Sequence, residues 1–248
     1  MVSLMDEEPS LSHLWEAVAQ QWAAWARKPD HDSYWRYHRE PFFALLPRPG
    51  RLTLDIGCGV GRVARDLKGM GHNVIAVDVS PTMVRLAKEA DPSMQVMVAD
   101  AASLPFNDGA ADLVVAFMSL HDVDDMPAAI LETARVLSSG GALCLAIVHP
   151  INSAGHFDSL GPDARFVIDD SYLHPHRYQE TIERDGLPMT FNSRHWPLEA
   201  YFTALANSGY VVEALRELTV DAGSVAERAD RARWLRVPLF LDLRARRQ

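Results

Sequence analysis

Glycines and acidic side chains cluster at one point of this chain, with a spacing that suits a nucleoside-type ligand. The run Leu52–Ile56 alternates in polarity, which predicts a buried strand. Gly57, Gly59 and Gly61 follow, and a helical pattern begins with Val63–Leu67. Glycine lacks a Cβ and readily adopts positive φ, so a glycine turn between strand and helix offers bare backbone N–H groups. The sequence therefore predicts a turn on which a ligand rests directly against backbone.

Three aspartates end three successive apolar runs. Asp55 ends the first, where its carboxylate can accept hydrogen bonds from the turn or from an ammonium group of a ligand. Asp78 ends the run 72–77, a position from which an acidic residue accepts hydrogen bonds from ribose hydroxyls. Asp100 ends the run 94–99 and can accept from an exocyclic amine such as that of adenine. A turn or helix-capping role is the alternative for each aspartate.

The glycine spacing discriminates between ligand classes. A dinucleotide fingerprint requires a third small residue at position 62, where this chain has Arg62. The turn also lacks the lysine with which a P-loop binds phosphates. Arg62 and the Asp100 block disfavour a nicotinamide-dependent reductase, and the missing lysine disfavours a P-loop.

Five blocks of the sequence together resemble the class I S-adenosylmethionine-dependent methyltransferases. They are Asp55-x-Gly-x-Gly-x-Gly, Asp78, Asp100-Ala101, Asp112-Leu-Val-Val and Arg135-Val-Leu-x-x-Gly-Gly. The resemblance covers residues 50–150 specifically and becomes looser toward the C-terminus. It implies a methyltransferase with S-adenosylmethionine as cofactor, in which Ala101 presents its backbone N–H to the adenine.

The expected cofactor-binding residues come from the glycine turn, the strand ends and the N-terminal helices. They are Tyr34, Arg39, Asp55, Gly57, Cys58, Gly59, Gly61, Asp78, Val79, Asp100, Ala101 and Met118. Met118 follows the fourth predicted strand and would close over the donor, with ordinary core packing as the alternative. Tyr34 and Arg39 would fold over the donor, with Arg39 reaching its carboxylate. For these two, packing of an aromatic helix face is the alternative.

Strands alternate with helices along the chain, which implies an α/β fold with a sheet covered on both faces. The resemblance makes the fold Rossmann-like, with seven mostly parallel strands and an antiparallel last strand. We expect one domain over residues 1–248. Its regions are an N-terminal helical cap (10–46), a cofactor-binding core (50–149), a substrate-lid insert (150–195) and a C-terminal helix with strands (196–248). The insert is long for a loop, and its aromatic side chains suit a lid over a small organic acceptor.

Two histidines are candidates for catalysis. His121 follows the fourth predicted strand and His149 the fifth, at the sheet edge where ligands bind. Methyl transfer is an in-line displacement, so alignment of an activated donor with the acceptor supplies much of the rate. A hydroxyl acceptor also needs a general base, for which His149 is the first candidate and His121 the second. A hydrogen-bonded loop residue is the alternative for both, and an amine or activated carbon acceptor needs no strong base.

Composition excludes several other functions. A formal net charge of −9 disfavours nucleic acid as a partner, because binding phosphates requires concentrated Lys and Arg. The acidic N-terminus has no leader pattern, and no apolar run approaches the roughly 18 residues that span a bilayer. These features predict a cytoplasmic protein without a membrane partner. The pair His174 and His176 lacks a clustered third ligand, and the segment after the fifth strand lacks the Asp-Asn pair of magnesium-dependent relatives, so no metal is expected.

The sequence thus predicts transfer of a methyl group to an oxygen, nitrogen or carbon atom of a small acceptor, within secondary-metabolite biosynthesis. Two alternatives stay open. One is a methyltransferase-fold binding module, and the other is an enzyme that uses S-adenosylmethionine for cyclisation or decarboxylation. The insert 150–195 also allows a homodimer interface.

Overall fold

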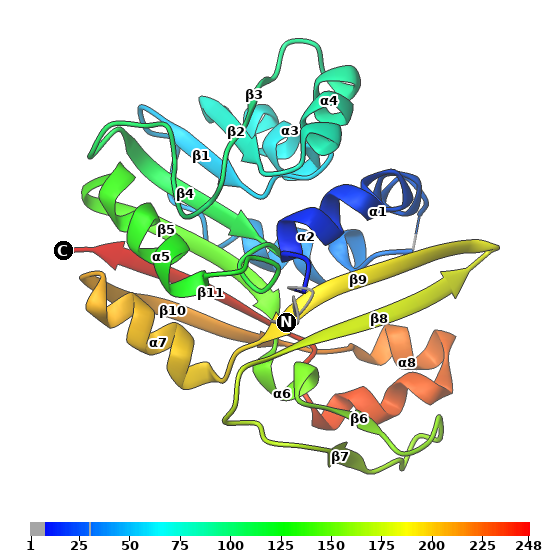
Figure 1. Ribbon diagram of the computed structural model, residues 1–248. Helices are drawn as coiled ribbons and strands as arrows, with labels where there is room; N and C mark the ends of the chain where they lie inside the picture. Colours follow the sequence, from blue (N-terminus) through cyan, green and yellow to red (C-terminus); the bar gives the residue numbers. More distant parts are fainter. Residues whose placement is uncertain (1–7, 30) are drawn as a thin grey trace, which may run out of the picture.

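One sheet of seven strands runs through the computed structural model, which describes residues 8–29 and 31–248 (Figure 1). Its strands are β1 (Thr53–Ile56), β2 (Val74–Asp78), β3 (Gln95–Val98), β4 (Ala111–Phe117), β5 (Leu137–Val148), β10 (Tyr210–Leu218) and β11 (Phe240–Arg247). Their order across the sheet is β10-β11-β5-β4-β1-β2-β3. Neighbours from β3 to β5 pair in parallel, and β11 pairs antiparallel with both β5 and β10. The expected Rossmann-like α/β fold is confirmed; residues 1–7 and 30 of the expected domain lie outside the described part.

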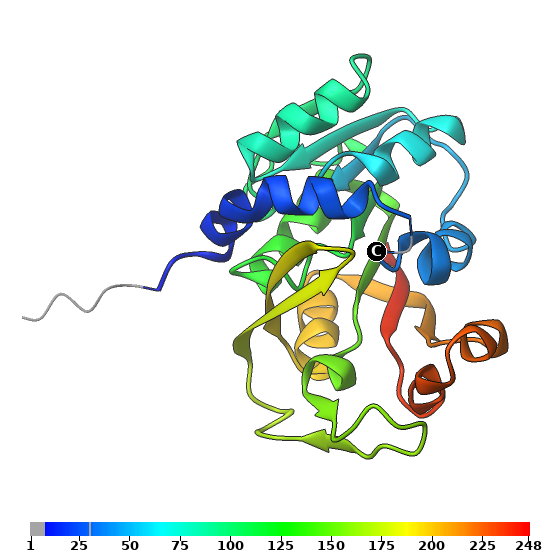
Figure 2. The ribbon, with the colours of Figure 1, turned by 90° about the vertical axis from the view of Figure 1, so that its right-hand side faces the viewer.

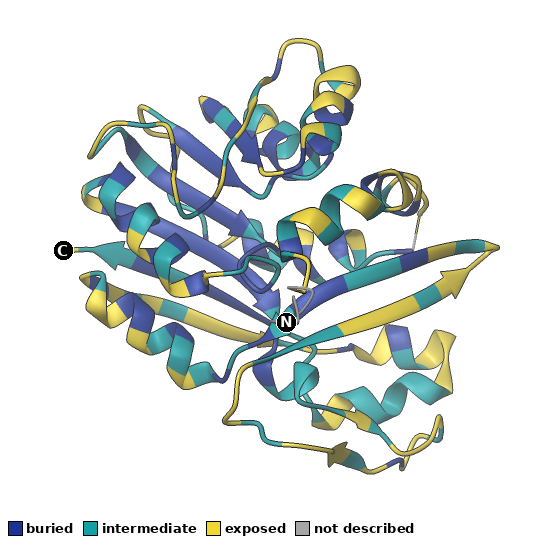
Figure 3. Cartoon of the chain, in the orientation of Figure 1, coloured by how far each residue is buried: buried dark blue, intermediate teal, exposed yellow. Residues whose placement is uncertain are grey.

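Helices cover both faces of this sheet. They are α3 (Arg62–Gly69) and α4 (Pro81–Ala90) on one face, and α5 (Met126–Val136) and α7 (Leu198–Asn207) on the other. Strand β4 shows why helices are needed on both faces, because successive side chains of a strand point to opposite faces of the sheet. Leu113 and Val115 pack into the core beneath α3, whereas Val114 and Ala116 pack beneath α5. Both faces of the central strands are therefore buried (Figure 3).

Short polar signals set the starts of two of these helices. Ser80 caps α4 by accepting a hydrogen bond from the Met83 N–H, and Pro81 occupies the first helical position. Asp125 caps α5 in the same way by accepting from Ala128 N–H. Because α4 begins directly after β2, this cap also fixes where the backbone turns after Asp78.

The N-terminal region consists of helix α1 (Leu11–Ala26), a π-helical turn η1 (Tyr34–His38) and helix α2 (Arg39–Phe43). Ala19 and Ala23 of α1 are buried against Val60 of the glycine turn and against α4. Helix α1 therefore packs with its buried face on the glycine turn and α4, and it runs between α4 and the β8–β9 hairpin (Figure 2).

The segment 150–195 is not an irregular loop. It contains helix α6 (Pro150–Ser153), the hairpin β6–β7 (Gly155–Phe157 and Phe166–Ile168) and the long hairpin β8–β9 (His176–Arg184 and Leu187–His195). Farther along the chain, α8 (Ala222–Glu227) and the 3-10 helix η2 (Ala229–Arg236) precede the last strand. The β8–β9 hairpin packs along α1, where Phe191 contacts the rings of Trp22 and Trp25, each with centroids 6.2 Å apart.

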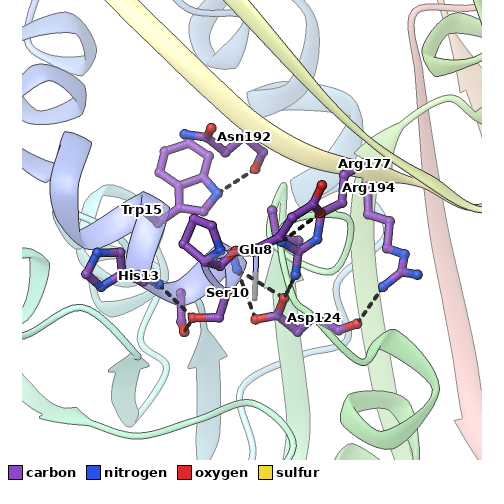
Figure 4. A network of polar contacts seen from close by, with 11 residues as sticks. Glu8, Ser10, His13, Trp15, Asp124, Arg177, Asn192 and Arg194 are labelled. Carbon is purple, nitrogen blue, oxygen red and sulfur yellow. Dashed lines mark hydrogen bonds and ion pairs between the residues drawn. The ribbon is translucent and has the colours of Figure 1, made fainter. Parts of the chain in front are cut away.

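Asp124, in the loop after β4, joins α1 to the β8–β9 hairpin (Figure 4). Its carboxylate accepts hydrogen bonds from Leu11 N–H at 3.0 and 3.1 Å, and from Arg177 Nη2 at 2.6 Å. Arg194 donates to the Asp124 carbonyl at 3.3 Å, and Trp15 Nε1 donates to the Asn192 carbonyl at 2.8 Å. The carboxylate of Asp124 thus holds the first turn of α1 and strand β8, and its backbone carbonyl holds β9. The negative charge of the carboxylate also favours the helix N-terminus.

We predict that Asp124→Ala destabilises the fold by about 1–2 kcal/mol, because it removes hydrogen bonds to a charged, half-buried group. Amide hydrogen exchange should accelerate in α1 and β8–β9 more than in β4 or β5. Asp108→Ala, which removes an exposed partner of Arg135, is the control and should cost less than about 1 kcal/mol. Equal exchange rates in wild type and Asp124→Ala would contradict the role of this contact.

Candidate cofactor and acceptor site

The glycine turn between β1 and α3 forms a bare backbone surface. Gly57, Gly59 and Gly61 have φ of +67°, +53° and +74°, the left-handed region that other residues rarely adopt. A Cβ at Gly57 would overlap the side chain of Ser119, which follows β4. A Cβ at Gly59 would lie 3.1 Å from the indole Nε1 of Trp22 on α1. The turn is therefore enclosed by two other segments, and only glycine fits it.

Asp78 holds the turn through hydrogen bonds to backbone. Its Oδ2 accepts from Gly59 N–H at 2.7 Å, and its Oδ1 accepts from Ser80 N–H at 2.9 Å. Burial raises the pKa of this carboxyl to about 6, against the opposing effect of these two N–H donors. A carboxylate at the end of β2 is thus fixed beside the bare turn, where it still has lone pairs for a ligand hydroxyl.

Asp55 is buried next to this group and has an oxygen without a partner. Its side chain is 1% exposed, and Oδ2 makes no hydrogen bond. Burial, followed by the charge of Asp78, raises the pKa of Asp55 to about 7, while the Ala64 N–H opposes the shift. An unpartnered acceptor, a second carboxylate and a turn without side chains at three positions together fit the cationic, hydroxyl-rich S-adenosylmethionine.

The residues that follow β2 and β3 include three more of the predicted cofactor residues, Val79, Asp100 and Ala101. Asp78 is in register with Val98, and Ala99 N–H donates to the Asp78 carbonyl at 3.0 Å. Val79 is 37% exposed beside them, and Ala101 is nearly buried. Asp100 is exposed, and its Oδ1 accepts from Ala102 N–H at 2.8 Å. This arrangement offers an apolar surface flanked by a carboxylate, as an adenine ring requires.

Cys58 and Met118 occupy backbone positions that shape the same edge. Cys58 N–H donates to the Val77 carbonyl at 3.0 Å, and burial raises the pKa of its thiol, so the residue acts through its backbone. Met118 has φ of +52°, which is strained for a residue with a side chain. Its N–H donates to the Ala146 carbonyl at 2.8 Å, and the neighbouring Ser119 hydroxyl donates to the Ile56 carbonyl at 2.8 Å. The strained turn thus ties the end of β4 to β5 and β1.

Tyr34 and Arg39 both bind Asp66 of α3. The Tyr34 hydroxyl donates to Asp66 Oδ2 at 2.5 Å, and Arg39 Nε donates to the same oxygen at 2.9 Å. Arg62 also lies 4.1 Å from the Tyr34 ring centroid. In this conformation the two residues hold η1 and α2 on α3, and their contact with a cofactor stays a prediction.

The two predicted catalytic histidines differ in the freedom of their ring nitrogens. His149 Nδ1 accepts from Ile151 N–H at 3.0 Å, which leaves its single ring proton on Nε2, 2.9 Å from Glu217 Oε1. Burial lowers the pKa of His149, partly offset by Glu217. His121 is 5% exposed, its Nδ1 has no partner, and burial followed by His38 lowers its pKa to about 3. In this conformation His121 keeps one ring nitrogen without a partner, although burial makes it a weak base, whereas both ring nitrogens of His149 have partners. The catalytic role of each histidine stays a prediction.

Sequence reasoning missed two acidic residues near the site. Glu16 on α1 accepts hydrogen bonds from the Ser80 hydroxyl and, at 2.7 Å, from the Thr82 hydroxyl, so it clamps α1 onto the start of α4. Asp242 is fully buried in β11 and lies 3.5 Å from His38 Nδ1. A lone charged residue inside the apolar run 239–243 was a signal for Asp242, whereas Glu16 looks like any polar position of an amphipathic helix.

Among the described residues, no group of three or more His, Cys, Asp or Glu side chains could hold a metal ion. Within the same residues, no helix is long and apolar enough to cross a membrane.

Known proteins share this arrangement. Residues 54–145 match the protein family described as methyltransferase domain. A demethylmenaquinone methyltransferase of Beutenbergia cavernae is 36% identical over 115 residues, which are 46% of this chain and 47% of that protein. The chain therefore spans about half the length of the curated relatives it matches.

Solved structures extend the likeness to most of the chain. An S-adenosylmethionine-dependent methyltransferase of Mesorhizobium loti superposes with a TM-score of 0.70 at 25% identity, over 88% of this chain and 99% of that one. The cyclase SpnF superposes with a TM-score of 0.63 at 18% identity over 96% of each chain, a likeness of fold alone. The fold and the glycine turn with its carboxylates are those of a Rossmann-like methyltransferase domain. The methyltransferase domain of this chain, matched over residues 54–145, belongs to the class I S-adenosylmethionine-dependent methyltransferases, whose cofactor is S-adenosylmethionine.

We predict that Gly57→Ala abolishes cofactor binding and destabilises the fold, because it combines a positive φ with overlap of the new Cβ and Ser119. The matched control is Gly186→Ala at the tip of β8–β9, where φ is +73° and an added Cβ would meet no other atom within 4 Å. That variant should lose only the roughly 1–2 kcal/mol of a left-handed residue. Thermal unfolding and calorimetric titration with S-adenosylhomocysteine measure both effects; equal losses in the two variants would refute the overlap argument.

The raised pKa of Asp55 predicts a pH dependence of stability. Its carboxyl has a pKa of about 7 in the folded chain and an ordinary value of 3.8. Between these values the folded state holds a proton that the unfolded state releases, so the free energy of unfolding falls as pH rises. Asp55→Asn should flatten this slope in urea titrations across the same pH range. Asp91→Asn should leave the slope unchanged above about pH 5, because the hydrogen bond from Lys68 lowers the pKa of Asp91 and this carboxyl is then ionised in both the folded and the unfolded state.

Proposed function

We propose that this chain catalyses transfer of a methyl group from S-adenosylmethionine to a small-molecule acceptor. The observation that carries the proposal is the bare turn at Gly57–Gly61, bonded to the buried Asp78 and adjoining the unpartnered carboxylate oxygen of Asp55. These groups match the ribose hydroxyls and positive charge of the cofactor. The family membership of the chain supports the same reading.

The residues of the chain would divide the work as follows. S-adenosylmethionine supplies an activated methyl group when it is bound. Asp78 and the glycine turn would bind the ribose of the cofactor. Val79, Asp100 and Ala101 would bind its adenine. Met118 and Ser119 separate this region from the ends of β5 and β11, and α1 with the β8–β9 hairpin covers the edge and excludes water. The chain thus acts mainly by alignment.

A small acceptor is favoured over a macromolecule for two reasons. The net charge of −9 repels nucleic acid, and the edge beyond β4 is roofed by α1 and the β8–β9 hairpin rather than open. The matched relative is named for demethylmenaquinone, a small molecule. The proposal includes an oxygen or nitrogen acceptor from secondary metabolism, with His121 or His149 close to it. It also includes a cytoplasmic location and an insert, residues 150–195, that acts as the lid.

The test is binding and turnover of the cofactor. At about 100 times the dissociation constant, S-adenosylmethionine and S-adenosylhomocysteine should each stabilise the chain by about 2.7 kcal/mol, or roughly 5–10 °C in Tm, and NAD should not. Asp78→Asn should lose this shift, because an amide cannot accept from both N–H groups that the carboxylate now holds. Stabilisation by NAD but not by S-adenosylmethionine would overturn the proposal.

A second measurement separates an enzyme from a binding module. Methyl-labelled S-adenosylmethionine incubated with a metabolite panel should give a labelled small molecule. Tight cofactor binding with no labelled product, or with a product that carries no label, would favour the binding module or another reaction type.

A further inference from the structure

Three buried side chains near the end of β4 concentrate polar atoms that have no partner. These are both ring nitrogens of His38, Nδ1 of His121 and both carboxylate oxygens of Asp242. His38 and Asp242 are completely buried, and His121 is 5% exposed. Buried polar groups in native proteins are almost always hydrogen-bonded, so such a cluster calls for an explanation.

The three side chains form one group although they come from distant segments. His38 is the last residue of the π-helical turn η1, Asp242 lies in β11, and His121 follows β4. His38 Nδ1 is 3.5 Å from Asp242 Oδ1, too long for a strong hydrogen bond, and His38 is close enough to His121 to lower its pKa. Single π-helical turns are rare and recur at functional sites.

The group lies beside the cofactor turn along the same edge of the sheet. Phe117 is in register with Ala146 of β5, and Ala146 is in register with Asp242 of β11. Adjacent strands are about 4.8 Å apart, so Asp242 lies about two strand spacings from the end of β4. Ser119, two residues beyond Phe117, is the residue that a Cβ at Gly57 would overlap. The cluster is therefore placed on the far side of Met118 from the cofactor motif, where an acceptor would lie.

Aromatic rings pack around this group. The His38 ring centroid is 5.1 Å from that of Phe117 and 4.2 Å from that of Phe240. Tyr37 lies 6.2 Å from Phe240 and extends the surface. Sites for aromatic small molecules are usually lined by flat apolar side chains around a few polar groups, as these residues are.

We propose that His38 is the catalytic base for a hydroxyl group on an aromatic ring of the acceptor, and that Asp242 is the positioning residue that orients it. The proposal rests on the proposed methyl transfer and names its substrate class. Asp242 faces Nδ1 and keeps the ring proton there, which leaves the lone pair of Nε2 for the acceptor. The hydroxyl proton moves to Nε2, and the electron pair left on oxygen forms the new O–CH3 bond while the electrons of the broken S–CH3 bond stay on sulfur. His38 then releases its proton to water.

The groups that face His38 from neighbouring elements agree with this role. They are Asp242 from β11 and His121 from the loop after β4. Arg216 from β10 is in register with Asp242 and is a further charged group near that carboxylate. Arg216 donates to the Pro41 carbonyl at 2.8 Å, close in sequence to His38. Asp242 is thus the nearest group that can stabilise a proton gained by His38, and His121 is a second polar contact for the bound oxygen.

The test uses 4-nitrophenol, a flat phenol whose phenolate form absorbs visible light, added to the full chain saturated with S-adenosylhomocysteine. The pH is set below the pKa of the free phenol. Transfer of the phenol proton to His38 should produce a saturable phenolate band in the wild type. His38→Gln should weaken this binding at least about tenfold, and Asp242→Asn should retain binding but lower the phenolate fraction. The control is His72→Asn, which should behave as the wild type. His72 is also buried, but it is bonded to Thr53 at the start of β1, at the opposite end of the strands from the cluster.

The affinity for S-adenosylhomocysteine, measured by calorimetry in every variant, separates this proposal from the proposed function. We expect that affinity to be unchanged within about twofold in His38→Gln, because His38 packs on Phe117 and Phe240 and faces Asp242, whereas Asp78, Trp22 and Ser119 surround the glycine turn. Absence of a saturable phenolate band in a wild type that binds S-adenosylhomocysteine, or an equal band in His38→Gln, overturns the role of His38 alone. Failure of the wild type to bind S-adenosylhomocysteine instead removes the proposed function, and the phenol titration without it still reports on His38.

Discussion

The hydrogen bond from Gly59 N–H to the carboxylate of Asp78 is the contact on which the site depends. It joins the turn after β1 to the end of β2, and it uses a backbone donor at a position that has no side chain. The same carboxylate accepts from Ser80, which caps α4, so the turn and the start of the next helix are set together. Asp55, buried beside this group, can be accommodated only where a cation or a proton offsets its charge.

Helix α1 connects the cofactor side of the molecule with the proposed acceptor side. Glu16 binds the first turn of α4 next to Asp78, and Trp22 covers Gly59. At its other end the helix shares Asp124 with the β8–β9 hairpin. Helix α1 therefore contacts both the glycine turn and the hairpin that covers the proposed acceptor region.

Hydrogen-bond partners, rather than burial, determine which buried histidine keeps a free ring nitrogen. Both ring nitrogens of His149 have partners, the Ile151 N–H and the Glu217 carboxylate, and His149 also caps α6. His38 and His121 are as deeply buried but keep unpartnered nitrogens. The position of a histidine after a strand therefore indicates that it lies at the ligand edge, whereas its partners determine whether a lone pair remains for a substrate.

The sequence by itself determined the sheet, its flanking helices and the cofactor turn, because strand periodicity, glycine spacing and helix caps are local properties. Asp55, Asp78 and Gly59 meet as expected, since parallel strands of an α/β sheet end at one edge. Only the tertiary structure decided the hairpins within residues 150–195 and the meeting of His38 with Asp242. It alone also decided the contacts by which Glu16 holds α1 on α4 and Asp124 holds α1 on the β8–β9 hairpin. These contacts join segments as many as about 200 residues apart, and no local pattern encodes which distant surface a polar side chain will face.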